Sequence, residues 1–290
     1  MLKFTIIGLF QGAVYGLLAV GLVLVYKGTR VFNFAQGEFG TVAAYTTWAM
    51  YQNVGIPYLA AVGMGLAVAV LLGLIVERLV IRPLLDASKI ALLVATVGVA
   101  LFIIAMTILI GKPETRFLDP LIQADPIFIF GAGVIWQQLL VALVLAGLAV
   151  VLAIFFKTDR GLAILATSQD PLATQIVGIS VPGMSRFIWA FAALLGGIAG
   201  ILQAPITIFA PGFMTSTSLI PAFVAAVLGG MTSLPGAFVG GLLVGVAQNT
   251  FGIYLLNQTW GVPGGADLSV FALLLLVLMI RPQGLLGKEA

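Results

Sequence analysis

Three polar side chains in one short segment are the first candidates for chemistry in this sequence. The segment VFNFAQGEFG, residues 31–40, carries Asn33, Gln36 and Glu38 between two long apolar runs. The two amides donate and accept hydrogen bonds, and an ionised carboxylate accepts them and attracts cations. Such groups are costly in apolar surroundings unless they find partners. These three residues are therefore candidates to line a path for a polar solute, or to gate it.

The composition indicates the elements that position them, which are apolar helices in a membrane. Of the 290 residues, 61% are hydrophobic and 8% are charged, whereas soluble proteins have about 25% charged residues. The sequence contains neither cysteine nor histidine, which excludes thiolate sites and the commonest metal ligand, so we expect no metal, cofactor or catalytic residue in this chain. Its basic residues are spread over many loops, unlike a nucleic-acid footprint.

The hydrophobic pattern predicts an all-α, polytopic protein with a single transmembrane domain over residues 1–290. A spanning helix needs about 20 apolar residues. The regular candidates are 4–26, 57–76, 90–111, 135–156 and 187–209, and the less regular ones are 33–51, 218–230, 236–256 and 268–280. Polar residues interrupt 33–51, and proline and glycine interrupt 218–256. Each of these two regions either crosses or re-enters, which leaves about eight or nine crossings.

Basic residues predict the orientation, because cytoplasmic loops are rich in lysine and arginine. If all nine segments cross, the N-terminus lies outside and the C-terminus lies in the cytoplasm. The inner loops then carry all but three of the 13 basic residues, namely Lys27, Arg30, Arg78, Arg82, Lys89, Lys157, Arg160, Arg186, Arg281 and Lys288. If 33–51 re-enters instead, the N-terminus moves to the cytoplasmic side.

Glycine pairs at small-xxx-small spacing predict close helix packing. They are Gly12–Gly16, Gly196–Gly200 and Gly241–Gly245. Small residues let two helix backbones approach within a membrane. A second interpretation is a pathway whose helices must slide.

Two interpretations of Glu38 stay open. In the structural one, Asn33 and Gln36 join two helices, and Glu38 anchors the turn at the interface by pairing with Lys27 or Arg30. In the functional one, this polar break lines the inner end of a solute path. An intramembrane carboxylate is costly, about 2.5 kcal/mol or more on insertion scales, so either role requires a partner or water.

The longest polar inner segment, residues 157–186, predicts a short helix at the membrane surface. Asp170 is a good N-cap, and Pro171 fits the first helical position. Apolar residues follow at helical spacing, and Gly178 can end the helix in the left-handed conformation. The apolar positions are Leu172, Ala173, Ile176 and Val177. This helix is either an ordinary interfacial element or a docking helix for a cytoplasmic partner.

Several motifs together resemble the permease subunits of ABC importers for branched-chain amino acids, over nearly the whole chain. They are NFAQGE at 33–38, Glu77-Arg78 followed by Arg82-Pro83-Leu84, ALLVATVGVALFI at 91–103, the loop positions Arg160, Gly161, Ala163, Asp170, Ala173 and 177–179, the stretch 225–245, and RPQGLLG at 281–287. Each motif is weak alone, but their order and spacing are specific.

The resemblance implies a mechanism and partners. Two permease subunits, the second a homologous chain, form the pathway in a bacterial plasma (inner) membrane. Two cytoplasmic ATPases drive it, with ATP bound on those partners, and an extracytoplasmic binding protein delivers the solute. The segment 157–186 would be the coupling loop, with Arg160, Gly161, Asp170, Pro171, Ala173, Ile176 and Gly178 in contact with the ATPase.

The sequence departs from the family pattern at three positions. Gln36 replaces the usual histidine, Gln169 replaces an acidic residue, and Pro221 lies where some relatives carry a basic residue, which makes it a further pathway candidate. The departures leave the solute open among amino acids, urea and short amides. The alternatives are a stand-alone secondary transporter or channel, or a sugar-type permease of the same superfamily. Ion coupling is disfavoured, because the spans contain few ionisable residues.

Overall fold

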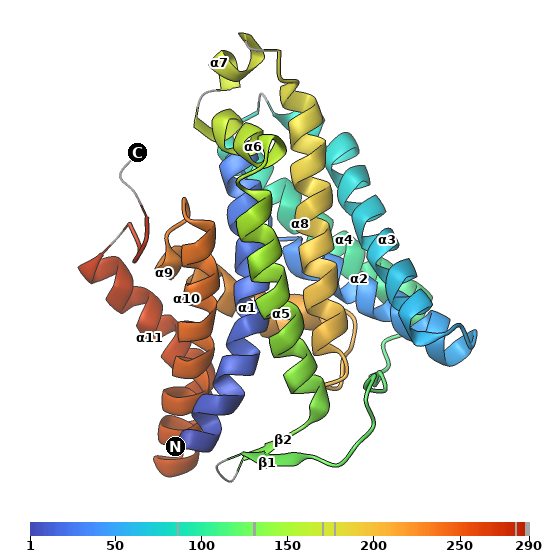
Figure 1. The fold of residues 1–290 in the computed structure, drawn as a ribbon, viewed down its shortest axis with the longest axis vertical. Helices are drawn as coiled ribbons and strands as arrows, with labels where there is room; N and C mark the ends of the chain where they lie inside the picture. The colour runs from blue at the N-terminus through green and yellow to red at the C-terminus, as the bar shows by residue number, and fades with distance from the viewer. Residues whose placement is uncertain (86, 130–131, 170, 177, 282, 288–290) are drawn as a thin grey trace. The chain divides into compact units, whose positions relative to one another are not determined.

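The fold is all-α, as the sequence predicts. The computed structural model describes residues 1–290 except 86, 130–131, 170, 177, 282 and 288–290. In the described part, the strands are β1 (Ile127–Ile129) and β2 (Ala132–Val134), which pair antiparallel (Figure 1). The chain divides into two compact units, the first comprising 1–23, 119–145 and 217–290, and the second 24–118 and 146–216.

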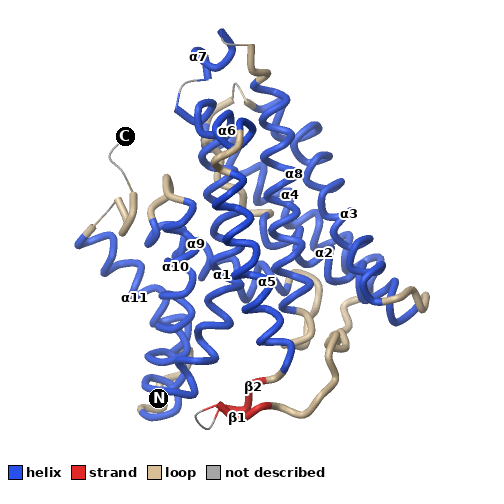
Figure 2. Tube along the Cα trace, in the orientation of Figure 1, coloured by secondary structure: helices blue, strands red, loops and turns tan. Residues whose placement is uncertain are grey.

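Helices account for most of the described chain (Figure 2). They are α1 (Leu2–Thr29), α2 (Gln36–Trp48), α3 (Tyr58–Val76), α4 (Lys89–Gly111), α5 (Trp136–Phe155), α6 (Asp159–Gln169), α7 (Pro171–Ile176), α8 (Val181–Gln203), α9 (Ile220–Gly229), α10 (Leu234–Ala247) and α11 (Gly265–Ile280). A 3₁₀ turn covers Arg82–Leu84. Wider π-helical turns cover Ala49–Asn53, Glu77–Ile81, Thr215–Leu219 and Gln248–Thr259. Such turns occur often at functional sites.

All nine predicted spans are helical, which confirms a polytopic membrane protein. Six described helices are long and apolar enough to cross a membrane: Leu2–Thr29, Tyr58–Leu84, Lys89–Gly111, Trp136–Phe155, Val181–Gln203 and Leu234–Thr259. Shorter apolar helices cover Thr215–Gly229 and Gly265–Ile280. The predicted bounds 187–209 are wrong, because α8 begins at Val181. The Ser180 hydroxyl caps it by accepting a hydrogen bond from the Gly183 N–H at 3.3 Å.

In the first unit, α1 and α10 pack backbone to backbone through glycine. A methyl group added at Gly12 would lie 2.6 Å from the carbonyl oxygen of Gly241. One added at Gly16 would lie 2.9 Å from the carbonyl oxygen of Phe238, and Gly245 packs on the backbone of Gly12. Two of the predicted glycine pairs therefore face each other across one helix crossing.

The C-terminal segment closes over the end of α9 in the same unit. The Leu285 N–H donates to the carbonyl oxygen of Leu228 at 2.7 Å, and the Leu286 N–H donates to that of Gly229 at 3.2 Å. Helix ends leave such carbonyls unpaired unless another segment satisfies them. Gly230 has a φ of 96° and Gly284 has a φ of 80°, in the region that favours glycine. This contact explains why the GG turn and the ending RPQGLLG occur together in one chain.

In the second unit, α8 is the central helix. In its most apolar stretch 67% of the residues are buried, against 28% in the span that begins with α3 and 22% in α4. A methyl group at Gly40 of α2 would lie 2.7 Å from the carbonyl oxygen of Gly196, and one at Gly73 of α3 would lie 2.9 Å from that of Trp189. The third predicted glycine pair, Gly196–Gly200, thus lies where α2 packs on α8. The candidate carboxylate stands at the start of α2.

Candidate functional site

The start of α2 is fixed to α8 by the two amides. The Asn33 side chain accepts a hydrogen bond from the Ala35 N–H at 3.0 Å and donates to Gln36 Oε1 at 3.1 Å. Gln36 Nε2 then donates to the carbonyl oxygen of Ala192 at 2.8 Å. Both amides are buried. Their hydrogen bonds position the first turn of α2. The two amides therefore join neighbouring helices, as expected in the structural interpretation of this segment.

Glu38, in the first turn of α2, is fully buried, with 0% of its surface exposed. The hydroxyls of Thr41 and Thr215 lie beside its carboxylate, but neither carboxylate oxygen has a hydrogen bond of ordinary geometry within the described chain. The expected pairing of Glu38 with Lys27 or Arg30 is wrong. The first turn of α2 faces the segment at Met214–Thr215 and not the end of α1.

Thr215 is a site residue that the sequence alone did not indicate. A methyl group added at Gly37 would lie 2.8 Å from Thr215 Oγ1 and 3.1 Å from the backbone of Met214, so this residue borders the first turn of α2. Thr215 Oγ1 is buried and lacks a hydrogen-bond partner in the described chain. The signal was the hydroxyl run TSTS at 215–218, which forms the π turn before α9 but lies at the edge of the predicted span.

Two further polar candidates stand apart from this cluster. Pro221 is buried in the first turn of α9 and belongs to the other compact unit. Glu77, at the start of the π turn after α3, is fully buried, and neither of its carboxylate oxygens has a partner in the described chain. The second unit therefore contains two buried carboxylates, of which Glu38 has neighbouring hydroxyls.

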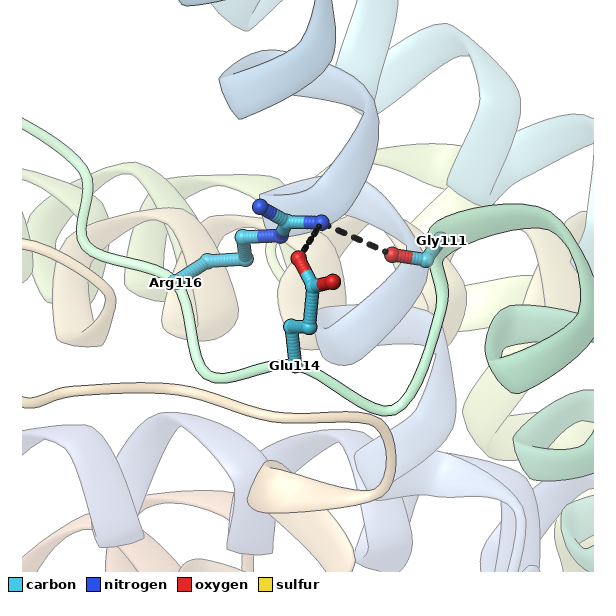
Figure 3. A network of polar contacts seen from close by, with 3 residues as sticks. All are labelled: Gly111, Glu114 and Arg116. Atoms are coloured by element: carbon cyan, nitrogen blue, oxygen red, sulfur yellow. Dashed lines mark hydrogen bonds and ion pairs between the residues drawn. The ribbon is translucent and has the colours of Figure 1, made fainter.

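Arg116 fixes the loop that follows α4 in the second unit (Figure 3). Its guanidinium lies 2.8 Å from Glu114 Oε2, donates to the carbonyl oxygen of Gly111 at 3.2 Å, and covers the Trp48 ring at 4.6 Å. Arg116 and Phe209 also exchange backbone hydrogen bonds of 2.7 and 2.9 Å. The exposed ion pair contributes little, about 0–1 kcal/mol. The backbone bridge and the aromatic contact hold this loop beside the ends of α2 and α8.

In its described part, the segment 157–186 contains two short helices and the start of α8, and the first of the short helices was not predicted from the sequence. The expected short helix lies at Pro171–Ile176, and Gly178 follows with a φ of 86°. The predicted cap Asp170 and the apolar Val177 lie outside the described residues. Helix α6 (Asp159–Gln169), which includes Arg160, precedes α7. The sequence signal for the start of α6 was Thr158, whose hydroxyl accepts a hydrogen bond from the Gly161 N–H at 3.4 Å. Gly161 packs on the backbone of Phe155 and Phe156.

Helix α7 exposes two apolar side chains. Ile176 is 85% exposed and Ala173 is also exposed, whereas the polar Thr174 is 2% exposed. A buried polar residue beside an exposed apolar one reverses the usual arrangement of a surface helix. Its exposed Ala173 and Ile176 make this helix a candidate for a surface that another protein covers.

The fold is that of a polytopic membrane protein, with a polar break at the start of α2 and an exposed helix on a polar loop. Residues 4–281 match the family described as branched-chain amino acid transport system / permease component, and the chain belongs to this family. It is therefore the transmembrane permease subunit of an ABC importer and works within an ABC transporter complex.

Known permeases are similar to this chain over nearly its full length. The high-affinity branched-chain amino acid transport system permease protein BraD of Pseudomonas aeruginosa is 31% identical, over 97% of this chain and 94% of its own. The corresponding protein LivH of Escherichia coli strain K12 is 29% identical over the same shares. A xylose/arabinose import permease protein of Sulfolobus acidocaldarius is more distant, at 26% identity over 75% of this chain. The sugar-type alternative is therefore less well supported.

A solved structure shares the fold. PsaBC from Streptococcus pneumoniae, in complex with Fab, superposes with a TM-score of 0.52 over 96% of this chain and 91% of its own, at 14% identity. This likeness concerns the arrangement of helices alone.

Proposed function

We propose that this chain forms half of the solute pathway of an importer for branched-chain amino acids. The observation that carries the proposal is the similarity to permeases named for these solutes, over 94–97% of this chain. A second, homologous permease subunit forms the other half. An extracytoplasmic binding protein delivers the solute, and ATP is bound and hydrolysed on two partner ATPases, so we expect no enzymatic activity in this chain.

The coupling segment runs from Arg160 to Gly178, with Asp170 and Pro171 at the start of its docking helix. In support, α7 exposes Ala173 and Ile176, and Gly161 allows α6 to pack against the end of α5. A short helix with an apolar face fits a groove on another protein, where a few buried side chains carry most of the binding free energy. We assign that groove to the ATPase.

We expect Ile176→Glu to uncouple the ATPase. A charge on the exposed apolar face would be desolvated in the groove, so binding of the ATPase subunits should weaken at least about tenfold. The measurement is co-purification of the ATPases with the tagged chain in mild detergent, followed by an ATPase assay. Gln175→Glu is the matched control, because it adds the same charge at a neighbouring exposed polar position of α7 and should leave co-purification intact. Equal co-purification of Ile176→Glu and wild type would remove α7 from the coupling interface.

Within the pathway we assign different roles to the polar residues. Glu38 faces the solute, while Asn33 and Gln36 hold the turn that presents it. In support, both amides are hydrogen-bonded inside the fold, whereas the carboxylate has no such bond in the described chain. Pro221 is a pathway residue at the start of α9, where its ring fits the first helical turn.

We place the protein in a bacterial plasma membrane, with the C-terminus in the cytoplasm and the N-terminus outside. Because the sequence has no cysteine, single cysteines report each loop without background. A membrane-impermeant maleimide should label Gln123→Cys in intact cells and Gln175→Cys only in inverted vesicles, since both side chains are exposed. Lys3→Cys decides between nine and eight crossings. Labelling of Lys3→Cys in intact cells supports nine, and protection there means that 33–51 re-enters.

A further inference from the structure

We propose that the carboxylate of Glu38 and the hydroxyl of Thr215 bind the primary ammonium group of the transported solute. This inference rests on the proposed function and adds to it the chemical group that the second unit recognises. The two residues come from α2 and from the π turn before α9, and they meet beside Gly37.

The first argument is unused hydrogen-bonding capacity. Glu38 Oε1, Glu38 Oε2 and Thr215 Oγ1 are buried, and none makes a hydrogen bond of ordinary geometry within the described chain, although the hydroxyls of Thr41 and Thr215 lie beside the carboxylate. Buried polar groups are almost always hydrogen-bonded, and each exception calls for an explanation. A ligand that supplies donors explains all three atoms at once.

The second argument is that the neighbouring polar groups are already engaged. The amides of Asn33 and Gln36 bond each other and the backbone of α8. Thr41 Oγ1 accepts a hydrogen bond from the Met214 N–H at 3.4 Å. The Thr41 O–H can still donate to the Glu38 carboxylate, so the open acceptors of this cluster are the remaining lone pairs of the two carboxylate oxygens and of the Thr215 hydroxyl.

The third argument is the chemistry of the match. A primary ammonium has three donors, no acceptor and a positive charge, and the cluster offers three acceptor atoms and a negative charge. Hydrogen bonds between ionised partners are stronger than those between neutral ones. Urea, a short amide or a sugar hydroxyl would leave the charge of Glu38 uncompensated. The site therefore favours zwitterionic or cationic amines over these neutral solutes.

The test separates the amino group from the rest of the solute. The complete permease–ATPase complex in lipid nanodiscs, without the binding protein, is titrated with 3-methylbutylamine and with 4-methylpentanoate, and binding is followed by saturation-transfer NMR. The first compound keeps the ammonium group of leucine, and the second keeps its carboxylate. The amine should bind the wild type at least about tenfold more tightly than it binds Glu38→Gln, the difference expected for one charged hydrogen bond.

Three further variants control the result. Thr215→Val removes the hydroxyl with little change of shape and should weaken amine binding, whereas Glu38→Asp keeps the charge and should restore part of it. Glu77→Gln neutralises the other buried carboxylate of the same unit and should bind the amine as the wild type does. Each variant should elute with its ATPases in size-exclusion chromatography, and a variant that does not has failed to fold. If Glu38→Gln fails to fold, amine binding by Thr215→Val tests the site in its place.

Two findings would overturn the inference: amine binding that is equal in the wild type, Glu38→Gln and Thr215→Val, or amine binding no tighter than that of the acid. The same preparations are assayed for ATP-driven leucine uptake with the binding protein added. A wild type that transports leucine without distinguishing amine from acid contradicts only the ammonium site. A wild type that fails to transport leucine contradicts the proposed function itself.

Discussion

Glu38→Gln should reduce uptake by about a hundredfold while the complex assembles normally. Glutamine has nearly the shape of glutamate, so the packing of α2 on α8 should persist. The substitution removes the negative charge that would hold the solute and one acceptor oxygen, and the loss of one charged hydrogen bond, worth about 1.5–3 kcal/mol, accounts for an effect of that size. The measurement is the initial rate of ATP-driven uptake, together with the amount of assembled complex in the membrane.

The controls distinguish a pathway role from a general need for a buried carboxylate. Glu77→Gln should retain uptake within a few-fold of wild type, because Glu77 is not part of the proposed ammonium site. Glu38→Asp should retain measurable uptake, since the charge remains. Wild-type uptake by Glu38→Gln would leave Glu38 with the structural role of starting α2, and its burial without a partner would then need another cause.

Gly12→Leu should prevent stable folding. The side chain would enter the crossing of α1 and α10, where a single methyl group already lies 2.6 Å from the carbonyl oxygen of Gly241 and 2.8 Å from the Cα atom of Leu242. Backbone atoms cannot rotate away as side chains do, so the two helices must separate. Overpacking typically costs about 1–3 kcal/mol, and a collision with backbone belongs at or above the top of that range. Thermal unfolding in detergent and the yield of monodisperse protein measure the loss.

Gly98→Leu is the matched control for this substitution. Gly98 also lies inside a spanning helix, α4, but a methyl group there meets no atom within 4 Å. Both changes raise helix propensity by the same amount. The difference in stability between the two variants therefore measures the effect of the clash between α1 and α10. A Gly12→Leu variant as stable as Gly98→Leu would mean that α1 and α10 do not pack in the described way.

The fold could be predicted well because its main signal is composition. Long apolar runs such as 90–111 have one physical solution in a bilayer, which is a helix. Glycine pairs likewise predicted contacts, since Gly12 and Gly245 meet as close packing requires. Helix ends were harder. The start of α8 depends on the Ser180 cap, a local hydrogen bond that an apolar count does not register, and α6 depends on Thr158 in the same way.

The site could be predicted only in part. The segment 33–38 was recognisable because polar groups are rare in apolar sequence, but the sequence could not tell which of them were already hydrogen-bonded. That distinction depends on α8, whose Ala192 carbonyl accepts from Gln36. Thr215 lies 177 residues after Glu38 in the chain, and only the tertiary fold brings them together. Proximity in sequence was also a poor guide to the partner of Glu38, because no ion pair joins its carboxylate to Lys27 or Arg30 in the described chain.

The decisive measurement is leucine uptake into proteoliposomes that contain this chain, its homologous permease subunit and both ATPases. The binding protein is added outside, and ATP is enclosed. We predict accumulation that requires both enclosed ATP and the binding protein, and that is lost in Ile176→Glu. Leucine entry through this chain alone, without ATP or partners, would instead identify a stand-alone carrier or channel and would refute the importer mechanism.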